Sequence, residues 1–249
     1  MNKFFSSLVL GFCFFSLTTQ AENRKFIGLA YDPDGKSLLY SEEHSYKNDY
    51  QHEVIYKEAD GQVFAKKTVD YRRSFIAPAF QQTNSRNGEY IETRYNNDDT
   101  LEVIYRENKD QQQANENIDV NESLVIDAGF DHFIRDHWDE LIEGKSKVIN
   151  YLLPSHQQSI DLRIESIDCS SVLLNGDDPN TINCWRVATD SWVFRILSAP
   201  LLLAYDKSTR HLLTFAGRSN ICDSKGDYQD VVIRYQYTYI QEEKSYVKN

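Results

Sequence analysis

Residues 127–144 read DAGFDHFIRDHWDELIEG, and this stretch decides how the rest of the chain can fold. At about 100° per residue, its apolar side chains gather on one side of a helix and its charged side chains on the other. The apolar side holds Phe130, Phe133, Ile134, His137, Trp138 and Leu141. Such a face must be covered by a second apolar surface. The sequence therefore predicts one long amphipathic helix, with Asp127 or Asp131 at its N-cap and Gly144 just past its end.

The remainder of the chain shows the alternation of polar and apolar residues that is typical of half-buried β-strands. Turn residues separate the expected strands, for example in Asp32-Pro33-Asp34-Gly35 and Ala59-Asp60-Gly61. The strands are expected at residues 26–31, 38–46, 53–57, 63–71, 89–95, 101–106, 145–153, 159–167, 185–188, 201–205, 212–216 and 229–240. The predicted fold class is mainly β (α+β): a curved antiparallel sheet or half-barrel of roughly a dozen strands, wrapped on the one long helix.

The ends and the middle of the chain set its domain organisation. Residues 1–21 combine Lys3, an apolar stretch too short to span a membrane comfortably, and small residues before a cleavage point, which predicts a secretory signal peptide. Residues 22–249 are expected to form a single β-rich domain. Within it, residues 108–121 have almost no apolar anchor and are expected to form a polar loop between an N-terminal meander (22–107) and the helix-led second half (122–249).

Charge and cysteine content indicate the compartment and the class of partner. The formal net charge of −11 over 249 residues disfavours nucleic acid and anionic membranes, because both require a basic surface. After cleavage of the signal peptide, no second apolar run is long enough for a transmembrane helix. Of the three remaining cysteines, Cys169 and Cys184 are the closest pair and the expected disulfide, with pairings to Cys222 as the alternatives.

Two segments resemble a known group of proteins. FDHFIRDHWDELIEGKSKVINYLLPS (residues 130–155) and YDKSTRHLLTFAGRSNI (residues 205–221) look like segments of uncharacterised exported proteins of Gram-negative bacteria. Those proteins form families of unknown function, whose architecture is similar to the half-barrel of lipoprotein carriers, a curved antiparallel sheet around a helix. The resemblance covers the second half of the chain and implies a fold and an exported, periplasmic location. It implies no catalytic residues.

Three residues on the apolar helix face are the candidates for lining a ligand cavity: His137, Phe133 and Trp138. His137 is expected either to donate to a backbone carbonyl as a buried neutral residue or to line a cavity under the sheet. His132, Asp136 and Asp139 share the polar face, but this pattern is also that of a solvated charged surface, and we predict no metal site and no cofactor. The Asp-rich segments 96–99 and 176–180 fit tight turns better than calcium loops.

No assembled catalytic site is predicted. The chain has no G-x-S-x-G motif, and the adjacency of Ser155 and His156 in sequence is not the geometry of a triad. Cys222 has no basic neighbour in sequence that would activate a thiol. The leading hypothesis is an exported, non-enzymatic protein that binds an apolar ligand, such as a lipid or acyl chain. The alternatives are a structural or assembly factor that binds an envelope protein through a sheet edge or residues 108–121, and a hydrolase without an identifiable site.

Overall fold

One continuous sheet of fifteen strands makes up most of the described part of the chain, which in this computed structural model comprises residues 25–172, 178–189 and 199–237. Its strand order is β8-β7-β6-β5-β4-β3-β2-β1-β15-β14-β13-β12-β11-β10-β9. Neighbours are antiparallel except for β9 and β10. The strands are β1 (Lys25–Tyr31), β2 (Leu38–Asn48), β3 (Gln51–Glu58), β4 (Val63–Asp70), β5 (Ala79–Asn84), β6 (Glu89–Tyr95), β7 (Thr100–Arg106), β8 (Ala114–Asp119), β9 (Leu124–Val125), β10 (Lys147–Leu153), β11 (Gln158–Ile167), β12 (Ile182–Ala188), β13 (Leu201–Asp206), β14 (Leu212–Cys222) and β15 (Tyr228–Tyr237).

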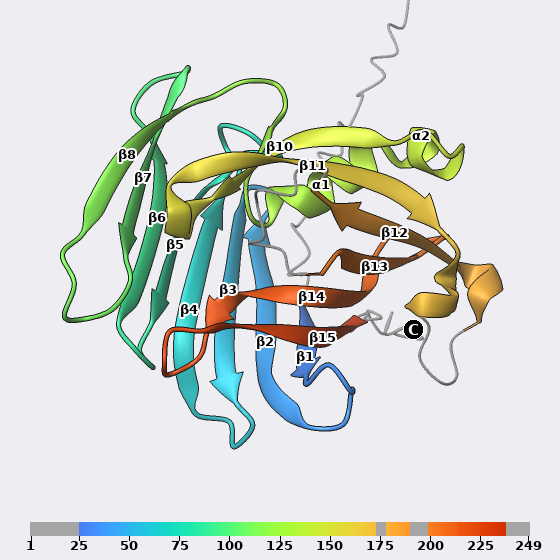
Figure 1. Cartoon of the computed structure of the whole chain (residues 1–249), viewed down its shortest axis with the longest axis horizontal. Helices are drawn as coiled ribbons and strands as arrows, with labels where there is room; N and C mark the ends of the chain where they lie inside the picture. Colours follow the sequence, from blue (N-terminus) through green and yellow to red (C-terminus); the bar gives the residue numbers. More distant parts are fainter. Residues whose placement is uncertain (1–24, 173–177, 190–198, 238–249) are drawn as a thin grey trace, which may run out of the picture.

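The sheet is curved and unclosed, and it consists of two halves that face each other (Figure 1). The strands β1–β8 form one half and β9–β15 the other, and the pairing of β1 with β15 joins them. The two halves also meet away from that seam, because the short helix η1 (Pro154–His156) lies against β6 and β7. The predicted mainly β, curved antiparallel sheet is therefore confirmed.

Alternation along each strand determines which side chains face the interior. In β3, His52, Val54 and Tyr56 are buried while their neighbours are more exposed, as expected for a side-chain period of two. In β4, Lys67 and Val69 are buried in the same way. This parity carries several polar side chains into the interior together with the apolar ones, and it positions the site described below.

The predicted single helix over residues 127–144 is wrong, because the structure has two short helices there, α1 (Gly129–Asp136) and α2 (Trp138–Ile142). The break falls at His137, whose φ of −103° and ψ of 16° are not helical. The His137 ring Nδ1 and backbone N–H both lie at hydrogen-bond distance from the carbonyl oxygen of Phe133, at 3.0 and 3.1 Å. Neither helix has a side-chain N-cap, so the expected capping by Asp127 or Asp131 is also wrong.

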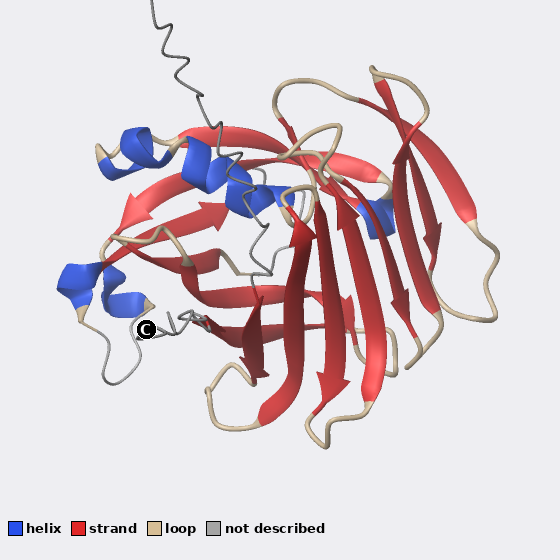
Figure 2. Cartoon of the chain, turned by 180° about the vertical axis from the view of Figure 1, so that it is seen from behind, coloured by secondary structure: helices blue, strands red, loops and turns tan. Residues whose placement is uncertain are grey.

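The two helices, blue in Figure 2, pack mainly on β10–β13, and α1 also approaches residues 71 and 76 beside the other half of the sheet. Phe133, Ile134, Trp138 and Leu141 form one core cluster with residues of β10–β13. Trp138 contacts Trp185 edge-on, with ring centroids 4.8 Å apart. The predicted apolar helix face is thus real, and it covers one end of the sheet.

Residues 108–121, expected to be a polar loop, include the strand β8. Its side chains are almost all exposed, so the burial signal that sequence patterns rely on is absent. The strand is held instead by its pairing with β7, in which Asn117 lies opposite Glu102. The strands β5 and β9 were likewise not expected from the sequence.

The disulfide expected between Cys169 and Cys184 is present, with Cα atoms 5.3 Å apart. It ties η2 (Cys169–Ser171) to β12, and η3 (Pro179–Thr181) directly precedes that strand. Cys222 is free and buried. The expected signal peptide at residues 1–21 lies outside the described residues, as do residues 238–240 of the last expected strand. Among the described residues, no helix has the length and apolarity needed to cross a membrane.

Candidate functional site

A cavity of about 700 Å³ lies between the two halves of the sheet. Its wall combines aliphatic side chains from both halves with phenylalanines and tyrosines, and α1 contributes Phe130 and Asp131. Representative aliphatic residues are Val54, Ile91, Leu162, Leu203 and Ile233. The volume and the mainly apolar lining are those of small-molecule pockets, which span about 300–1,000 Å³.

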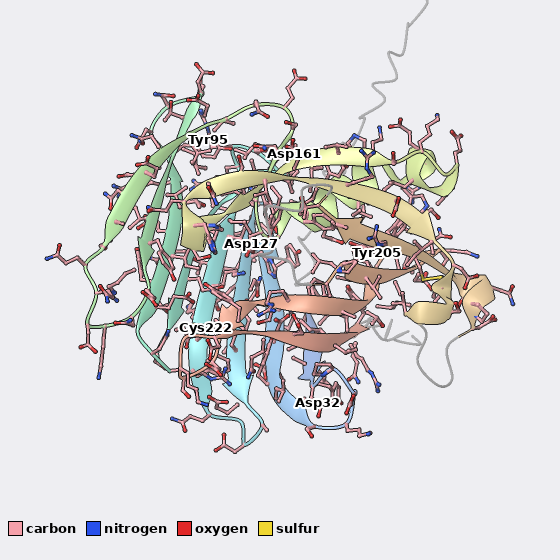
Figure 3. The ribbon with its side chains drawn as sticks, viewed as in Figure 1. Asp32, Tyr95, Asp127, Asp161, Tyr205 and Cys222 are labelled. Atoms are coloured by element: carbon pink, nitrogen blue, oxygen red, sulfur yellow. A yellow bond between two sulfur atoms is a disulfide. The ribbon has the colours of Figure 1, made fainter. Side chains whose placement is uncertain are left out.

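A buried ion pair between Lys67 and Asp127 faces this cavity. Asp127 is labelled in Figure 3, between the two halves of the sheet. The Lys67 ammonium, in a side chain that is 2% exposed, lies 2.6 and 2.8 Å from the two Asp127 carboxylate oxygens. Each of these oxygens accepts a second hydrogen bond, one from the backbone N–H of Ala128 and one from the side-chain amide of Asn220. The Asp127 carboxylate is therefore saturated by protein donors.

The backbone of Asp127 is unusual, with φ of +43°. The left-handed region is uncommon for residues other than glycine, although Asp and Asn tolerate it best. Asp127 precedes Gly129, where a Cβ atom would come within 2.0 Å of the Ile76 carbonyl oxygen. The close approach of α1 to residue 76 thus requires a glycine. The Asp127 carboxylate joins the start of α1 to Lys67, because it accepts from both the Ala128 N–H and the Lys67 ammonium.

A second polar group on the wall consists of Glu42, His44 and His52. The Nδ1 of His44 lies 3.0 Å from the Nε2 of His52, and its Nε2 lies 3.2 Å from the Glu42 carboxylate. The Tyr235 hydroxyl donates to the same Glu42 oxygen at 3.4 Å. Gly28 makes this approach possible, because a Cβ there would lie 2.8 Å from the Tyr235 ring. Burial, followed by the nearby Glu42 charge, raises the pKa of Tyr235 well above its usual range, so Tyr235 is a neutral donor.

Aromatic rings continue from this group across four strands. Phe26 stacks on His44 at 4.2 Å and on Tyr237 at 4.7 Å, and Tyr46 stacks on His52 at 4.2 Å. These are directly opposed residues on neighbouring strands, which is where cross-strand stacking is expected. All five line the cavity, and we call them the aromatic row. Such stacked rings offer a rigid, mainly apolar surface to a ligand.

A third polar cluster lies where β14 and β15 meet β5 and β6. The Tyr228 hydroxyl donates to the Glu89 carboxylate, and the Asn84 side-chain amide donates to the Cys222 carbonyl at 2.9 Å. Burial raises the pKa of Glu89 above its usual range. Burial and the nearby Glu89 carboxylate raise the pKa of the Cys222 thiol to about 12. This cysteine is therefore a protonated, unactivated thiol at neutral pH, as its sequence context indicates.

The three residues predicted to line a cavity are not among the residues of the cavity wall. Phe133 and Trp138 are buried in the core between the helices and β10–β13. His137 stacks on Phe133 at 4.1 Å and bonds the Phe133 carbonyl, which is the core alternative considered for it. Their neighbour Phe130, on the same predicted face, does line the cavity.

The remaining sequence candidates do not assemble into a site. Among the described residues, no group of three His, Cys, Asp or Glu side chains could hold a metal ion. On the polar helix face, Asp139 contacts Arg210 at 3.3 Å, and His132 packs against the Tyr71 ring. Ser155 Oγ and His156 Nδ1 lie 3.0 Å apart at the cavity rim, but acyl transfer also requires a third group that orients the base.

The sequence contains a usable signal for the polar cavity residues that were not predicted from it. Lys67 lies at an inward position of its strand, between Ala65 and Val69, and Glu42 and His44 alternate with the outward residues of β2 in the same way. Charged residues at inward positions of an amphipathic strand are either paired or functional. Their partners could not be read from the sequence, because Asp127 lies sixty positions after Lys67.

The chain matches no family model, no curated protein and no solved structure. The resemblance of residues 130–155 and 205–221 to exported Gram-negative proteins therefore stays a prediction. The features of the molecule that bear on its function are the cavity and its polar groups.

Proposed function

We propose that the protein is a non-enzymatic carrier or receptor that binds an apolar or amphipathic small molecule, such as a lipid or acyl chain, in the cavity between the two halves of the sheet. The observation that carries the proposal is a cavity of about 700 Å³ with a mainly aliphatic and aromatic wall. A carrier requires an apolar cavity of this size, whereas a protein that acts only through its outer surface does not need one. Burial of an apolar chain there contributes roughly 25 cal/mol for each Å² removed from water.

The location proposed for this function is an exported, periplasmic one. The Cys169–Cys184 disulfide supports it, because such bonds persist in oxidising compartments. The signal-like sequence of residues 1–21 supports it independently.

Fluorescence titration with N-phenylnaphthylamine, an uncharged probe that brightens in apolar surroundings, tests the proposal. We expect saturable binding of about one probe per chain, and competition by a long-chain lipid. Leu212→Trp places a larger side chain in the cavity wall and should weaken probe binding, whereas Val148→Trp adds the same ring at a half-exposed position of β10 that does not line the cavity. Linear, unsaturable fluorescence with the folded protein would refute the proposal.

The alternative of an assembly factor has one supporting observation. β8 is the last strand on its side of the sheet, and five of its six side chains are exposed. An edge strand of this kind can pair with an extended segment of another protein. If this is the function, replacing residues 114–119 by a Gly/Ser sequence should abolish co-purification of an envelope protein. The rest of the sheet should stay folded.

A further inference from the structure

Some polar groups of the cavity wall already have hydrogen-bond or ion-pair partners within the protein, and others do not. This difference bears on what the ligand can be. Lys67 and Arg218 are the lysine and arginine residues of the described wall. Lys67 is bound by both oxygens of Asp127, and Arg218 lies 2.9 Å from the Asp230 carboxylate. Both fixed cations therefore already have an acidic partner.

The acidic residues of the wall also disfavour a negatively charged ligand. Glu42 and Asp131 also line the cavity, and Asp131 is held by Arg135 at 2.6 Å and by the Tyr205 hydroxyl at 3.1 Å. A ligand carboxylate that approached Lys67 would lie beside the Asp127 carboxylate, which already accepts two of the three N–H groups of the Lys67 ammonium. Like charges at such distances in a poorly solvated site repel each other strongly.

One uncharged polar atom of the wall, Gln82 Oε1, has in contrast no hydrogen-bond partner among the described residues. Gln82 is about 1% exposed. The orientation of the Gln82 amide is fixed, because its Nε2 donates at 3.0 Å to the Asn220 carbonyl, which can only accept. Gln82 also lies directly opposite Lys67 across the β4–β5 ladder. A buried acceptor that lacks a donor is unfavourable by about 1–3 kcal/mol.

We propose, building on the proposed carrier function, that the cavity selects ligands whose polar end is uncharged and can donate a hydrogen bond, such as a long-chain alcohol, amide or glyceride, and discriminates against free fatty acids. A hydroxyl or amide N–H donates to Gln82 Oε1 and leaves the Lys67–Asp127 pair intact. A carboxylate can do neither. The apolar chain then lies along the aliphatic wall and the aromatic row.

Displacement of N-phenylnaphthylamine by dodecanol and by dodecanoate at pH 8, where the acid is ionised, tests this selectivity at constant chain length. We expect dodecanol to compete at a concentration at least tenfold lower than dodecanoate. If the probe itself does not bind, the carrier function fails. If the probe binds and dodecanoate competes as well as dodecanol or better, the carrier function stands and this inference is overturned.

Variants locate the selectivity. Gln82→Leu removes the acceptor and should weaken dodecanol binding about fivefold, the equivalent of one neutral hydrogen bond, with probe affinity unchanged. Gln81→Leu, on the exposed face of the same strand, is the matched control and should change neither. Asp127→Asn keeps a residue that tolerates positive φ and frees the Lys67 charge, so dodecanoate should then bind at least tenfold more tightly than to the wild type. An unchanged preference in both Gln82→Leu and Asp127→Asn would overturn the assignment.

Discussion

Lys67 of β4 forms an ion pair with Asp127, which lies sixty positions later in the chain. The pair faces the cavity, and the Lys67 side chain is almost completely buried. The pair connects the N-terminal half of the sheet to the entry of α1, so it fixes the cavity wall as well as its charge. Desolvating two charges is unfavourable, and their attraction compensates for it only when both partners remain.

Removing one charge of this pair should therefore destabilise the protein far more than removing both charges. Lys67→Met leaves the Asp127 charge in the wall, and we expect it to lower the free energy of unfolding by about 3–5 kcal/mol. Combining it with Asp127→Asn removes the unpaired charge and should recover a large part of that loss. Urea unfolding of the wild type, both single variants and the double variant gives the coupling energy directly. Strictly additive effects would mean that the two charges do not depend on each other.

How far the sequence predicts this site depends on the kind of interaction involved. The period of two in residues 38–46 and 63–71 places Glu42, His44 and Lys67 inward, because alternation is a local property of a strand. The partner of Lys67 is set by how the two halves of the sheet face each other, which no local pattern contains. The same holds for the approach of Asn84 of β5 to Cys222 of β14.

The helix shows the opposite case, in which a correct local pattern leads to an incorrect element. The apolar face through Phe133, Trp138 and Leu141 is buried, as the period of the pattern predicts. The pattern contains no information about the break at His137, where both the ring Nδ1 and the backbone N–H lie at hydrogen-bond distance from the Phe133 carbonyl. β8 was missed for a related reason, since an exposed edge strand has no apolar face to detect.

Cys222 should be inert toward thiol reagents in the folded protein. Its sulfur is buried and its pKa is raised to about 12, so the reactive thiolate is scarce at pH 8. Iodoacetamide followed by peptide mass spectrometry should find Cys222 unmodified in native protein and fully modified in guanidinium chloride. Cys169 and Cys184 should be recovered as a disulfide-linked peptide under both conditions. Rapid native labelling of Cys222, or alkylated Cys169, would contradict this arrangement.

Glu89 should make the protein less stable as the pH rises. Burial raises its pKa in the folded state above the value of about 4.3 for an unfolded chain, so the folded state holds the proton over a pH range in which the unfolded state has lost it. Stability from this group is therefore complete below the unfolded pKa and is lost as the pH rises through the folded pKa. Glu89→Gln preserves an acceptor for Tyr228 and should flatten this part of the stability profile.

Urea unfolding at several pH values tests the role of Glu89. The values should run from about pH 4, near the usual carboxyl pKa, to about pH 8. Glu107→Gln, at an exposed position, serves as the control and should leave the profile as in the wild type. If the Glu89→Gln and wild-type profiles are parallel over the whole range, Glu89 does not titrate differently in the two states.

Trp138 should be the most important contact between the helices and the sheet. It is 4% exposed, and its ring meets Trp185 at 4.8 Å and Tyr205 at 6.0 Å. Truncating a buried aromatic residue costs about 3–5 kcal/mol, so Trp138→Ala should lower the free energy of unfolding by that amount. Asp136→Ala, on the exposed side of α1, should cost about 0.5 kcal/mol or less.

His137→Phe then separates the core around the helices from the ligand cavity. The His137 ring packs on Phe133 and does not belong to the cavity wall, so the substitution should change stability while probe affinity per folded molecule stays that of the wild type. The denaturation midpoint and the N-phenylnaphthylamine titration measure the two quantities on the same sample. A loss of probe affinity at an unchanged midpoint would place His137 in the cavity after all, and equal small effects of Trp138→Ala and Asp136→Ala would show that the helices do not stabilise this end of the sheet.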